Sequence, residues 1–233
     1  MISGKTIITS REPIIVRCEQ GTDEWRGLRT GIPSASMFEK IMSPVKCTKS
    51  SQQKAYAAKL AAMRCGWSEP RFETAAMTEG IEREPEVVAA YCVATGSEVD
   101  DNVGFVYGDS SLSYGCSPDG LVGDDGGLEC KYPQLNTLLE WRYDSVVPSK
   151  HLSQVNGSLF ITAREWWDFC AYNEDHEPFI VRVHRDDEQY QKWEKKFVPI
   201  LRDFVALVEA MVPDWVPPIK DQLEASLEML GVN

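Results

Sequence analysis

The segment over residues 116–131 most constrains how this chain folds, because the turn GDDGG at residues 123–127 separates two short runs. Glycine and aspartate supply the positive φ angles of tight turns, so the segment predicts a β-hairpin. Residues two apart on a strand share one face of a sheet. A three-residue loop centred on Asp124 would place Asp119 opposite Glu129 on one face. A two-residue loop would separate these carboxylates.

The three-residue register also determines on which face of the hairpin the other residues lie. It places Ser117 opposite Lys131 on the carboxylate face and turns Val122, Leu128 and Cys130 toward a core. Two close carboxylates repel each other unless a proton or a metal lies between them, and such oxygen ligands suit Mg²⁺ or Mn²⁺. With a lysine that orients an attacking water, this is the equipment of a metal-dependent phosphodiesterase. The spacing alone fits a solvated polar hairpin equally well.

The composition is that of a globular chain. Of the 233 residues, 43% are hydrophobic and 26% charged, which is enough for a sizeable core. The chain has no apolar run of transmembrane length and its first residues lack a signal-peptide core, so we expect a soluble cytoplasmic protein without membrane contact. The cysteines are scattered without a C-x-x-C pair, which favours reduced thiols over an iron–sulfur or zinc site.

The charge distribution bears on nucleic-acid binding. A net charge of −12 disfavours a protein that simply coats DNA. From residue 40 to residue 68, however, the chain has no acid and carries a basic stripe of Lys40, Lys46, Lys49, Lys54, Lys59 and Arg64. Such a stripe binds phosphates even on an acidic protein, and we take Lys46, Lys49 and Lys54 as candidate DNA-backbone contacts. A solvated helix face explains the stripe equally well.

Periodicity and turn signals predict the order of elements. We expect strands over 14–16, 102–107, 112–116, 166–172 and 179–184, and helices over 22–29, 34–42, 52–64, 78–95, 136–143, 148–161 and 187–212. Pro85 either kinks the helix over 78–95 or marks its true start. We expect His151 at the surface. The leucines at 223, 227 and 230 have helical spacing, which suits a protein contact or oligomer packing after Pro218.

The N-terminal region contains a candidate anion site. The helix over 22–29 stops near Gly31, and Ser34 or Ser36 then opens the next helix. Free N–H groups and hydroxyls at a helix N-terminus bind anions, and Arg29 beside them would complete a phosphate pocket. The alternative is that both serines only cap the helix.

Several of these motifs together resemble the phage lambda exonuclease (YqaJ-type viral recombinase) family within the PD-(D/E)XK nuclease superfamily. Residues 116–121 and 127–133 (CSPDGL and GLECKYP) resemble its catalytic hairpin. Residues 20–25, 28–32 and 34–36 are similar to its phosphate-binding motif, 80–84 to its helix with a metal-proximal Glu, and 151–156 to its glutamine motif. The chain departs from the family pattern at Cys130, Asn156 and Pro85.

The resemblance implies an α/β fold with a restriction-endonuclease-like core, in which helices flank a central mixed sheet. It implies one nuclease domain over 1–233, with an N-terminal helical part at 1–66 that carries the phosphate motif. The catalytic core would span 78–184 and a C-terminal tail 214–233.

The resemblance also implies an activity. The protein would be a Mg²⁺-dependent 5′→3′ exonuclease, with Mn²⁺ as a substitute ion. It would digest one strand of linear double-stranded DNA to 5′-mononucleotides and leave a 3′ tail for strand annealing. The implied partners are DNA ends, a single-strand annealing recombinase and further copies of the chain in a trimeric ring, in a bacterial host that a phage or prophage occupies.

Carried over by position, the resemblance assigns residue roles. Asp119 and Glu129 would ligate the metal with the carbonyl of Cys130, and Glu84 would lie near a second ion. Lys131 would orient the attacking water and Gln154 would support the catalytic face. The residues that would hold the 5′ phosphate are Arg29, Ser36, Ser117 and, adjacent to them, Ser34.

Two other functions stay open at this point. The same fold also serves structure-specific and restriction-type endonucleases, and a decayed site would leave a non-catalytic DNA-end-binding module. The presence of Asp119, Glu129 and Lys131 together disfavours the decayed site.

Overall fold

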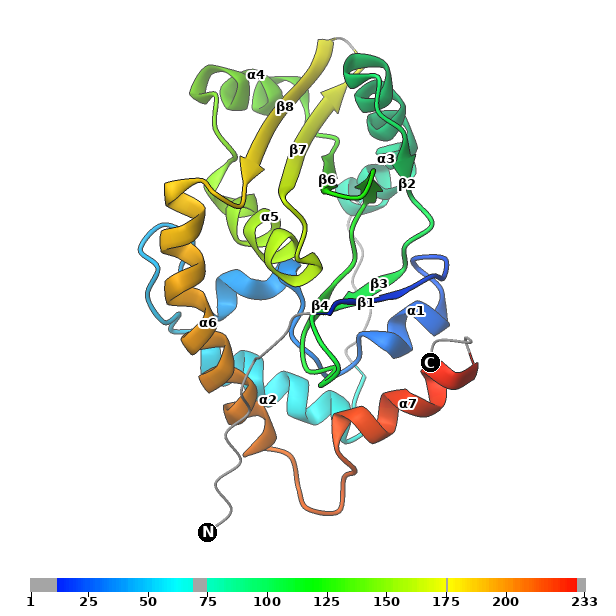
Figure 1. The fold of residues 1–233 in the computed structure, drawn as a ribbon, viewed down its shortest axis with the longest axis vertical. Helices are drawn as coiled ribbons and strands as arrows, with labels where there is room; N and C mark the ends of the chain where they lie inside the picture. The colour runs from blue at the N-terminus through cyan, green and yellow to red at the C-terminus, as the bar shows by residue number, and fades with distance from the viewer. Residues whose placement is uncertain (1–11, 69–74, 175, 230–233) are drawn as a thin grey trace.

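A five-stranded mixed sheet forms the upper part of the molecule (Figure 1). The structure, a computed structural model, describes residues 12–68, 75–174 and 176–229. The strand order is β2-β5-β6-β7-β8, and only the β6–β7 pair is parallel among these neighbours. The strands are β2 (Val99–Asp100), β5 (Gly120–Val122), β6 (Gly126–Lys131), β7 (Trp166–Asn173) and β8 (His176–His184). This sheet confirms the predicted α/β class.

A small antiparallel sheet lies below the large one. Its strand order is β1-β3-β4, with β1 (Ile14–Val16), β3 (Phe105–Tyr107) and β4 (Gly115–Cys116). Strands β3 and β4 are shorter than the predicted runs over 102–107 and 112–116. Residues 117–119 connect β4 to β5, so this short segment joins the two sheets.

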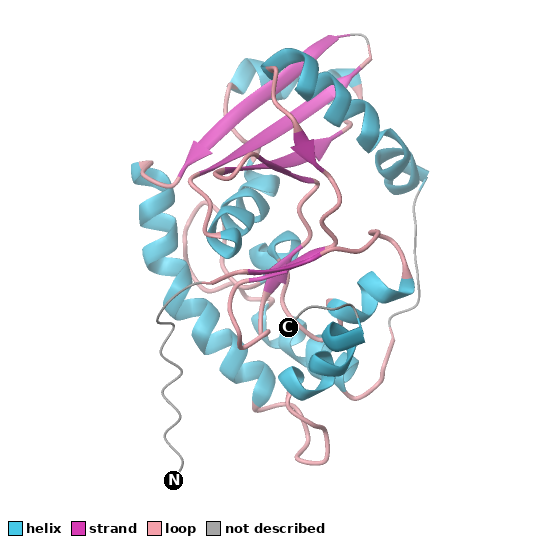
Figure 2. Ribbon diagram, turned by 45° about the vertical axis from the view of Figure 1, so that its right-hand side comes forward, coloured by secondary structure: helices cyan, strands magenta, loops and turns pink. Residues whose placement is uncertain are grey.

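Helices cover both faces of the large sheet (Figure 2). On one face lies α3 (Ala75–Thr95), which buries Val87 and Tyr91 against apolar side chains of β5, β6 and β7. On the other face lie α4 (Leu135–Asp144) and α5 (Ser149–Thr162). The main hydrophobic core fills the space between this second face and the helices.

Three further helical elements extend the main core. They are η1 (Ala35–Lys40), a 3₁₀ helix, α2 (Gln53–Arg64) and the long α6 (Glu188–Glu209). The buried stripe of α6 recurs at helical spacing, as the amphipathic pattern over 187–212 predicts. Phe197 in this stripe packs on Phe38 of η1 with 4.6 Å between ring centroids. Gly157 lets η1 approach α5, because a Cβ there would lie 2.6 Å from the Phe38 ring.

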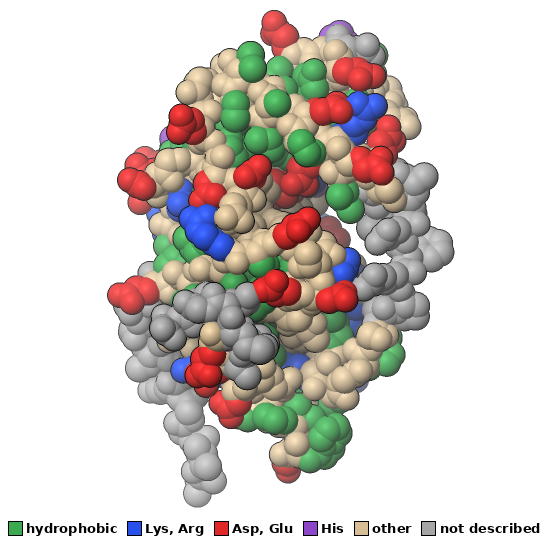
Figure 3. Space-filling model, turned by 90° about the vertical axis from the view of Figure 1, so that its right-hand side faces the viewer, with side chains coloured by type: hydrophobic (Ala, Val, Ile, Leu, Met, Phe, Trp, Pro, Cys, Tyr) green, Lys and Arg blue, Asp and Glu red, His purple; other side chains and the backbone are tan. Residues whose placement is uncertain are grey.

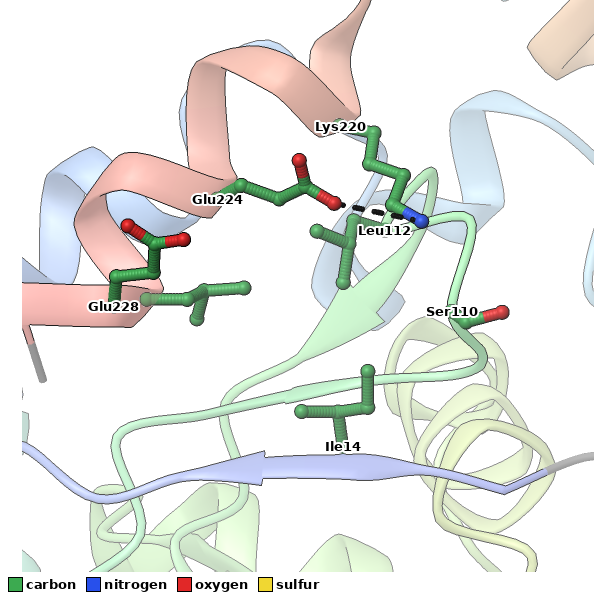
Figure 4. Close-up of a pocket in the computed structure, with 7 residues that line it drawn as sticks. Ile14, Ser110, Leu112, Lys220, Glu224 and Glu228 are labelled. Atoms are coloured by element: carbon green, nitrogen blue, oxygen red, sulfur yellow. Dashed lines mark ion pairs between the residues drawn. The ribbon is translucent and has the colours of Figure 1, made fainter. Parts of the chain in front are cut away.

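A second core joins the small sheet to α1 (Asp23–Leu28) and α7 (Ile219–Met229). Helix α7 buries Ile219, Leu223 and Leu227 in it, beside a cleft of about 270 Å³ that Figure 4 shows in close-up. Lys220 and Glu224 form an ion pair of 3.5 Å along the rim of this cleft. The apolar stripe of the tail therefore packs within the chain at 223 and 227, and Leu230 lies outside the described residues.

Predictions for two helices need correction, one for its start and one for its type and length. Helix α3 runs through Pro85, so a start at that proline is wrong. Pro85 and Ile81 are both exposed, so water can satisfy the carbonyl that loses its partner four residues before the proline. The predicted helix over 34–42 is the shorter 3₁₀ helix η1, whose N-cap Ser34 makes no side-chain capping bond.

The described surface is acidic in character. Asp and Glu side chains are spread over the face in Figure 3, in keeping with the net charge of −12. None of the helices in the described ranges is both long enough and apolar enough to cross a bilayer.

Candidate active site

The hairpin of β5 and β6 has the predicted three-residue register. Val122 pairs with Gly126 and Gly120 with Leu128, which closes the loop over residues 123–125 with Asp124 at its centre. Val122, Leu128 and Cys130 lie in the core beneath α3, as the alternation predicts. Arg164 fixes the turn from outside, since its Nη1 donates to the carbonyls of Gly123 and Gly126 at 2.7 Å each.

Two carboxylates and a lysine meet at the open end of this hairpin. Lys131 donates from Nζ to Glu129 Oε1 and, at 2.9 Å, to the carbonyl of Cys130. Asp119, which directly precedes the first paired residue of β5, accepts the backbone N–H of Cys130 at 2.6 Å. Glu129 is fully buried, and its Oε2 has no hydrogen-bond partner in the described part of the chain. One carboxylate oxygen is therefore left for a ligand.

The electrostatics show that a third carboxylate approaches from α3. Burial, and then the charge of Asp119, raises the pKa of Glu129 to about 8 and that of Glu84 to about 7. Burial also raises the pKa of Asp119. The pKa of Lys131 is also raised. Burial disfavours its charged form, but the charges of Glu129 and Asp119 outweigh burial and keep it protonated. Protons or a cation must neutralise such a cluster.

The donor set fits a divalent cation. Carboxylate and carbonyl oxygens are the ligands of Mg²⁺ and Mn²⁺, and the partnerless Glu129 Oε2 offers one of them. Across residues 12–68, 75–174 and 176–229, however, no three His, Cys, Asp or Glu side chains already converge as a metal cluster. The reason is that Asp119 binds the Cys130 N–H and Glu129 binds Lys131. A cation would have to draw these side chains together.

A cationic pocket lies between α1 and η1. The Arg29 guanidinium stacks over the Trp25 ring at 4.3 Å from its centroid, and its Nη2 lies 3.5 Å from Ser34 Oγ. The Ser34 and Ser36 hydroxyls lie 3.1 Å apart. A parallel bridge between Ser34 and Gly115 ties this serine to β4. The structure thus brings three of the four predicted phosphate residues together.

The pocket has the electrostatic character of an anion site. Burial lowers the pKa of Arg29, and no carboxylate within the described ranges forms an ion pair with it. Burial raises the pKa of Tyr56, beside it, to about 12, so this phenol is neutral. The pocket measures about 540 Å³ and is open to solvent beside Lys59 and Trp67. A half-buried guanidinium without a carboxylate suits an anion from outside the chain.

Ser117 connects the pocket to the carboxylates. Its hydroxyl accepts the indole N–H of Trp25 at 2.9 Å, and the next residue, Pro118, accepts a bond from the Gln20 amide at 2.8 Å. Asp119 follows directly. Our sequence analysis included Gln20 and Trp25 in the phosphate-binding motif over 20–25 but gave neither residue an individual role. The four-residue spacing of Trp25 and Arg29 was a usable signal, because such residues are neighbours on a helix.

The basic stripe over 40–68 is not one continuous surface. Arg64 is buried, donates to the Gly31 carbonyl at 2.8 Å and pairs with Glu209, so its inclusion in the stripe was wrong. Lys49 is exposed but forms a 2.9 Å ion pair with Asp203. Lys46 and Lys54 are exposed. Tertiary partners far along the chain therefore remove Arg64 from the surface and engage Lys49.

Helix α5 places the glutamine motif over the sheet face that carries Glu129 and Lys131. Gln154 is partly buried there, and Asn156 is buried with no partner for its Oδ1 in the described part. His151, expected at the surface, is only partly exposed, because its ring packs between Trp141 and Phe169.

A mixed α/β sheet whose hairpin brings two carboxylates and a lysine beside an anion pocket is characteristic of PD-(D/E)XK nucleases. The family model of the YqaJ-like viral recombinase domain matches residues 24–165. The chain belongs to this family.

Solved structures agree with this assignment. LHK-Exo, an alkaline exonuclease from Laribacter hongkongensis, is 30% identical, with a TM-score of 0.68 over 82% of this chain and 96% of that chain. Its complex with dAMP matches with the same values. A phage-related exonuclease from Haemophilus somnus 129PT, 14% identical with a TM-score of 0.54 over 77% of this chain and 96% of that chain, shares the fold. The curated proteins contain no match. These relatives support a nuclease role.

Proposed function

We propose that the protein is a Mg²⁺-dependent exonuclease that digests one strand of linear double-stranded DNA from its 5′ end. The products would be 5′-mononucleotides and a 3′ single-stranded tail, which a single-strand annealing partner would bind. The observation that carries this proposal is the short segment over 117–119. It joins an anion pocket at Ser117 to the carboxylate cluster at Asp119.

Each group has a proposed task. Asp119 and Glu129 would hold Mg²⁺ with the Cys130 carbonyl, and Glu84 would lie near a second ion. When bound, the cation would act as a Lewis acid on the scissile phosphate. Lys131 would orient the attacking water, and Gln154 would support the catalytic face. The terminal 5′ phosphate would bind Arg29, Ser34, Ser36 and Ser117.

Two observations on relatives and charge support these details. LHK-Exo is described as an alkaline exonuclease, and one of its structures holds dAMP, a nucleotide of the proposed product class. The raised pKa values of Glu129 and Glu84, about 8 and about 7, require alkaline pH for both acids to be charged without a cation. A higher pH would therefore favour cation binding by the proposed enzyme, because metal binding must release these protons.

The central experiment compares linear duplexes that carry a 5′ phosphate or a 5′ hydroxyl, with Mg²⁺ and with a chelator. We expect digestion only with Mg²⁺ and faster from the phosphate end. In Arg29→Met the phosphate end should lose about 10-fold to 100-fold in rate, since a hydrogen bond to a charged group contributes about 1.5–3 kcal/mol. Equal rates at both ends in the wild type would refute the pocket's role, and digestion with chelator would refute the metal's role.

A second experiment tests the cluster. Asp119→Ala and Lys131→Ala should each lower the digestion rate about 1,000-fold or more and leave DNA binding intact, because they remove charge from the reacting phosphate's surroundings. The matched control is Asp124→Asn at the hairpin tip, which should digest at the wild-type rate. Undiminished digestion by either alanine variant contradicts the assignment.

A covalently closed circular duplex tests the requirement for an end. An exonuclease leaves it intact, whereas an endonuclease cuts it. We also propose that copies of the chain form a ring with a basic lining, which would reconcile DNA binding with the acidic face in Figure 3. Light scattering would measure the number of copies, and a monomer at working concentration would rule out the ring.

A further inference from the structure

His151 is a packed, polar side chain to which the proposed reaction gives no task. It lies in the first turn of α5. Its ring stacks on Phe169 of β7 with 5.3 Å between centroids and meets Trp141 of α4 edge-on at 5.4 Å. Aromatic rings on two sides restrict the plane of the imidazole.

The strand register places this ring over the catalytic face. Phe169 pairs with Glu129 across the parallel β6–β7 ladder, and paired residues turn their side chains to the same face of a sheet. Lys131 lies two residues beyond Glu129 and shares that face. Phe169 belongs to the core beneath α5, which confirms which face this is. His151 and Lys131 are therefore on the same side of the sheet, over adjacent strands.

One nitrogen of His151 lacks a partner. Its Nε2 is buried and accepts or donates no hydrogen bond within the described residues. Leaving such an atom unsatisfied costs about 1–3 kcal/mol. Burial, and next the charges of Lys131 and Lys150, lowers the pKa of His151 to about 3, so the ring is neutral. A neutral imidazole has one bare nitrogen, and a nearby ammonium favours that nitrogen on the buried side.

Lys131 has a donor that matches. Its ammonium carries three N–H groups. The bonds it makes to described residues, to Glu129 Oε1 and to the Cys130 carbonyl, use two of them. One N–H therefore remains for an acceptor on the same face.

We propose that His151 is a positioning residue for Lys131, whose remaining N–H donates to the bare Nε2 of His151 through one bridging water. The importance of this contact for catalysis rests on the proposed nuclease function. A second acceptor holds the ammonium on the catalytic face when the Glu129 carboxylate turns toward a cation. Lys131 then stays aimed at the attacking water.

The kinetic test compares two substitutions. His151→Phe keeps the aromatic stack and removes the acceptor, so kcat should fall by up to about 100-fold while KM for a linear duplex changes less than about 2-fold. His151→Gln restores an acceptor and should regain most of that rate. His184→Gln, on the exposed end of β8, is the control and should match the wild type. A wild-type rate in His151→Phe, or equal losses in both His151 variants, overturns the proposal.

A spectroscopic test needs no digestion. The chain has three histidines, so ring-nitrogen NMR of protein with labelled histidine can assign His151 by its absence in His151→Gln. We expect the proton on Nδ1 and a bare Nε2 whose shift changes in Lys131→Met. A proton on Nε2, or no response to Lys131→Met, overturns the proposal. If the wild type digests no DNA, the proposed function fails, but this measurement still decides the contact.

Discussion

Glu129 is a fully buried acid that both contacts Lys131 and keeps one carboxylate oxygen for a ligand. One oxygen accepts from Lys131, the other has no partner among the described residues, and the pKa is raised to about 8. An unfolded chain would titrate this acid near its ordinary pKa of about 4.3. Between these values the folded state holds more protons than the unfolded state. Without a cation, stability therefore falls as the pH rises through this window.

Magnesium should reverse this trend, because it binds the deprotonated carboxylates of the folded state only. We expect the rise in Tm on adding Mg²⁺ to be larger at about pH 9 than at about pH 6. At a Mg²⁺ concentration about 100-fold above Kd, the gain in unfolding free energy would be about 2.7 kcal/mol. Thermal unfolding with Mg²⁺ and with chelator at both pH values measures it.

Two aspartates provide the comparison for this experiment. Asp119→Asn should abolish most of the Mg²⁺ effect, and Asp124→Asn at the hairpin tip should retain it. A Mg²⁺ effect that is the same at both pH values, or one that survives in Asp119→Asn, contradicts the cation site.

Which residue contacts the sequence predicts depends on how far apart the two residues are along the chain. Asp119, Glu129 and Lys131 lie on one hairpin, so local alternation predicts that they share a face once the three-residue loop fixes the register. Arg64 is different, because its partner Glu209 is 145 residues away. Spacing within the basic stripe carries no information about such a partner.

Among the elements, β6 depends on two glycines that fit beneath tryptophans of the neighbouring strand. A Cβ at Gly126 would lie 2.1 Å from Trp166, and one at Gly127 would lie 2.1 Å from Trp167. Trp167 is fully buried and cannot move aside. The two glycines that open β6 directly after the turn therefore allow this strand to pack against β7.

A pair of glycine substitutions tests this packing. Gly127→Ala should lower the free energy of unfolding by about 1–3 kcal/mol through overpacking, and digestion should fall with it. Gly80→Ala in α3, where a Cβ meets nothing within 4 Å, should raise it by about 0.5–1 kcal/mol. Urea unfolding measures both. Equal stability of the two variants would mean that the Trp167 contact does not restrict β6.

The boundaries of many elements were predictable from the sequence. The side-chain contacts that hold these elements in place were not. The strand over 14–16 and the helix that ends at Arg64 occur as predicted, because periodicity and caps are local signals. The clamp that Arg164 places on the hairpin turn comes from 38 to 41 residues away. Buried Tyr91 and Asp168, with exposed Arg182, likewise join α3 to two strands through hydrogen bonds of 2.7–2.8 Å. Only tertiary packing brings such residues together.

Across the whole molecule, the anion pocket lies between two cores, since Ala35, between Ser34 and Ser36, is buried in the main core. Leu28 and Ile32, on either side of Arg29, are buried in the second core, which α7 completes. The hairpin packs on the cores of the large sheet. The C-terminal helix therefore supports the pocket although it contributes no residue to it, a role that the spacing of its leucines alone did not reveal.

Truncating one leucine of α7 tests whether the second core supports the anion pocket. Leu223→Ala, at a site 4% exposed, should cost about 2–4 kcal/mol and reduce the preference for a 5′ phosphate. Leu139→Ala in α4, 48% exposed, should change stability by less than about 0.5 kcal/mol. Urea unfolding and paired rates on the two kinds of end provide the readouts. An unchanged phosphate preference in a destabilised Leu223→Ala would show that the pocket does not depend on α7.

Under the proposed mechanism, the segment from Ser117 to Asp119 fixes the distance between the bound 5′ phosphate and the cation site. Trp25 holds one end of this segment and the Cys130 N–H holds the other. Two residues of backbone span at most about 7 Å, and covalent geometry rather than packing sets that limit. Under the proposed mechanism, substitutions around the site alter how fast the enzyme cuts but not where. A product of different length requires a residue inserted into this segment or deleted from it.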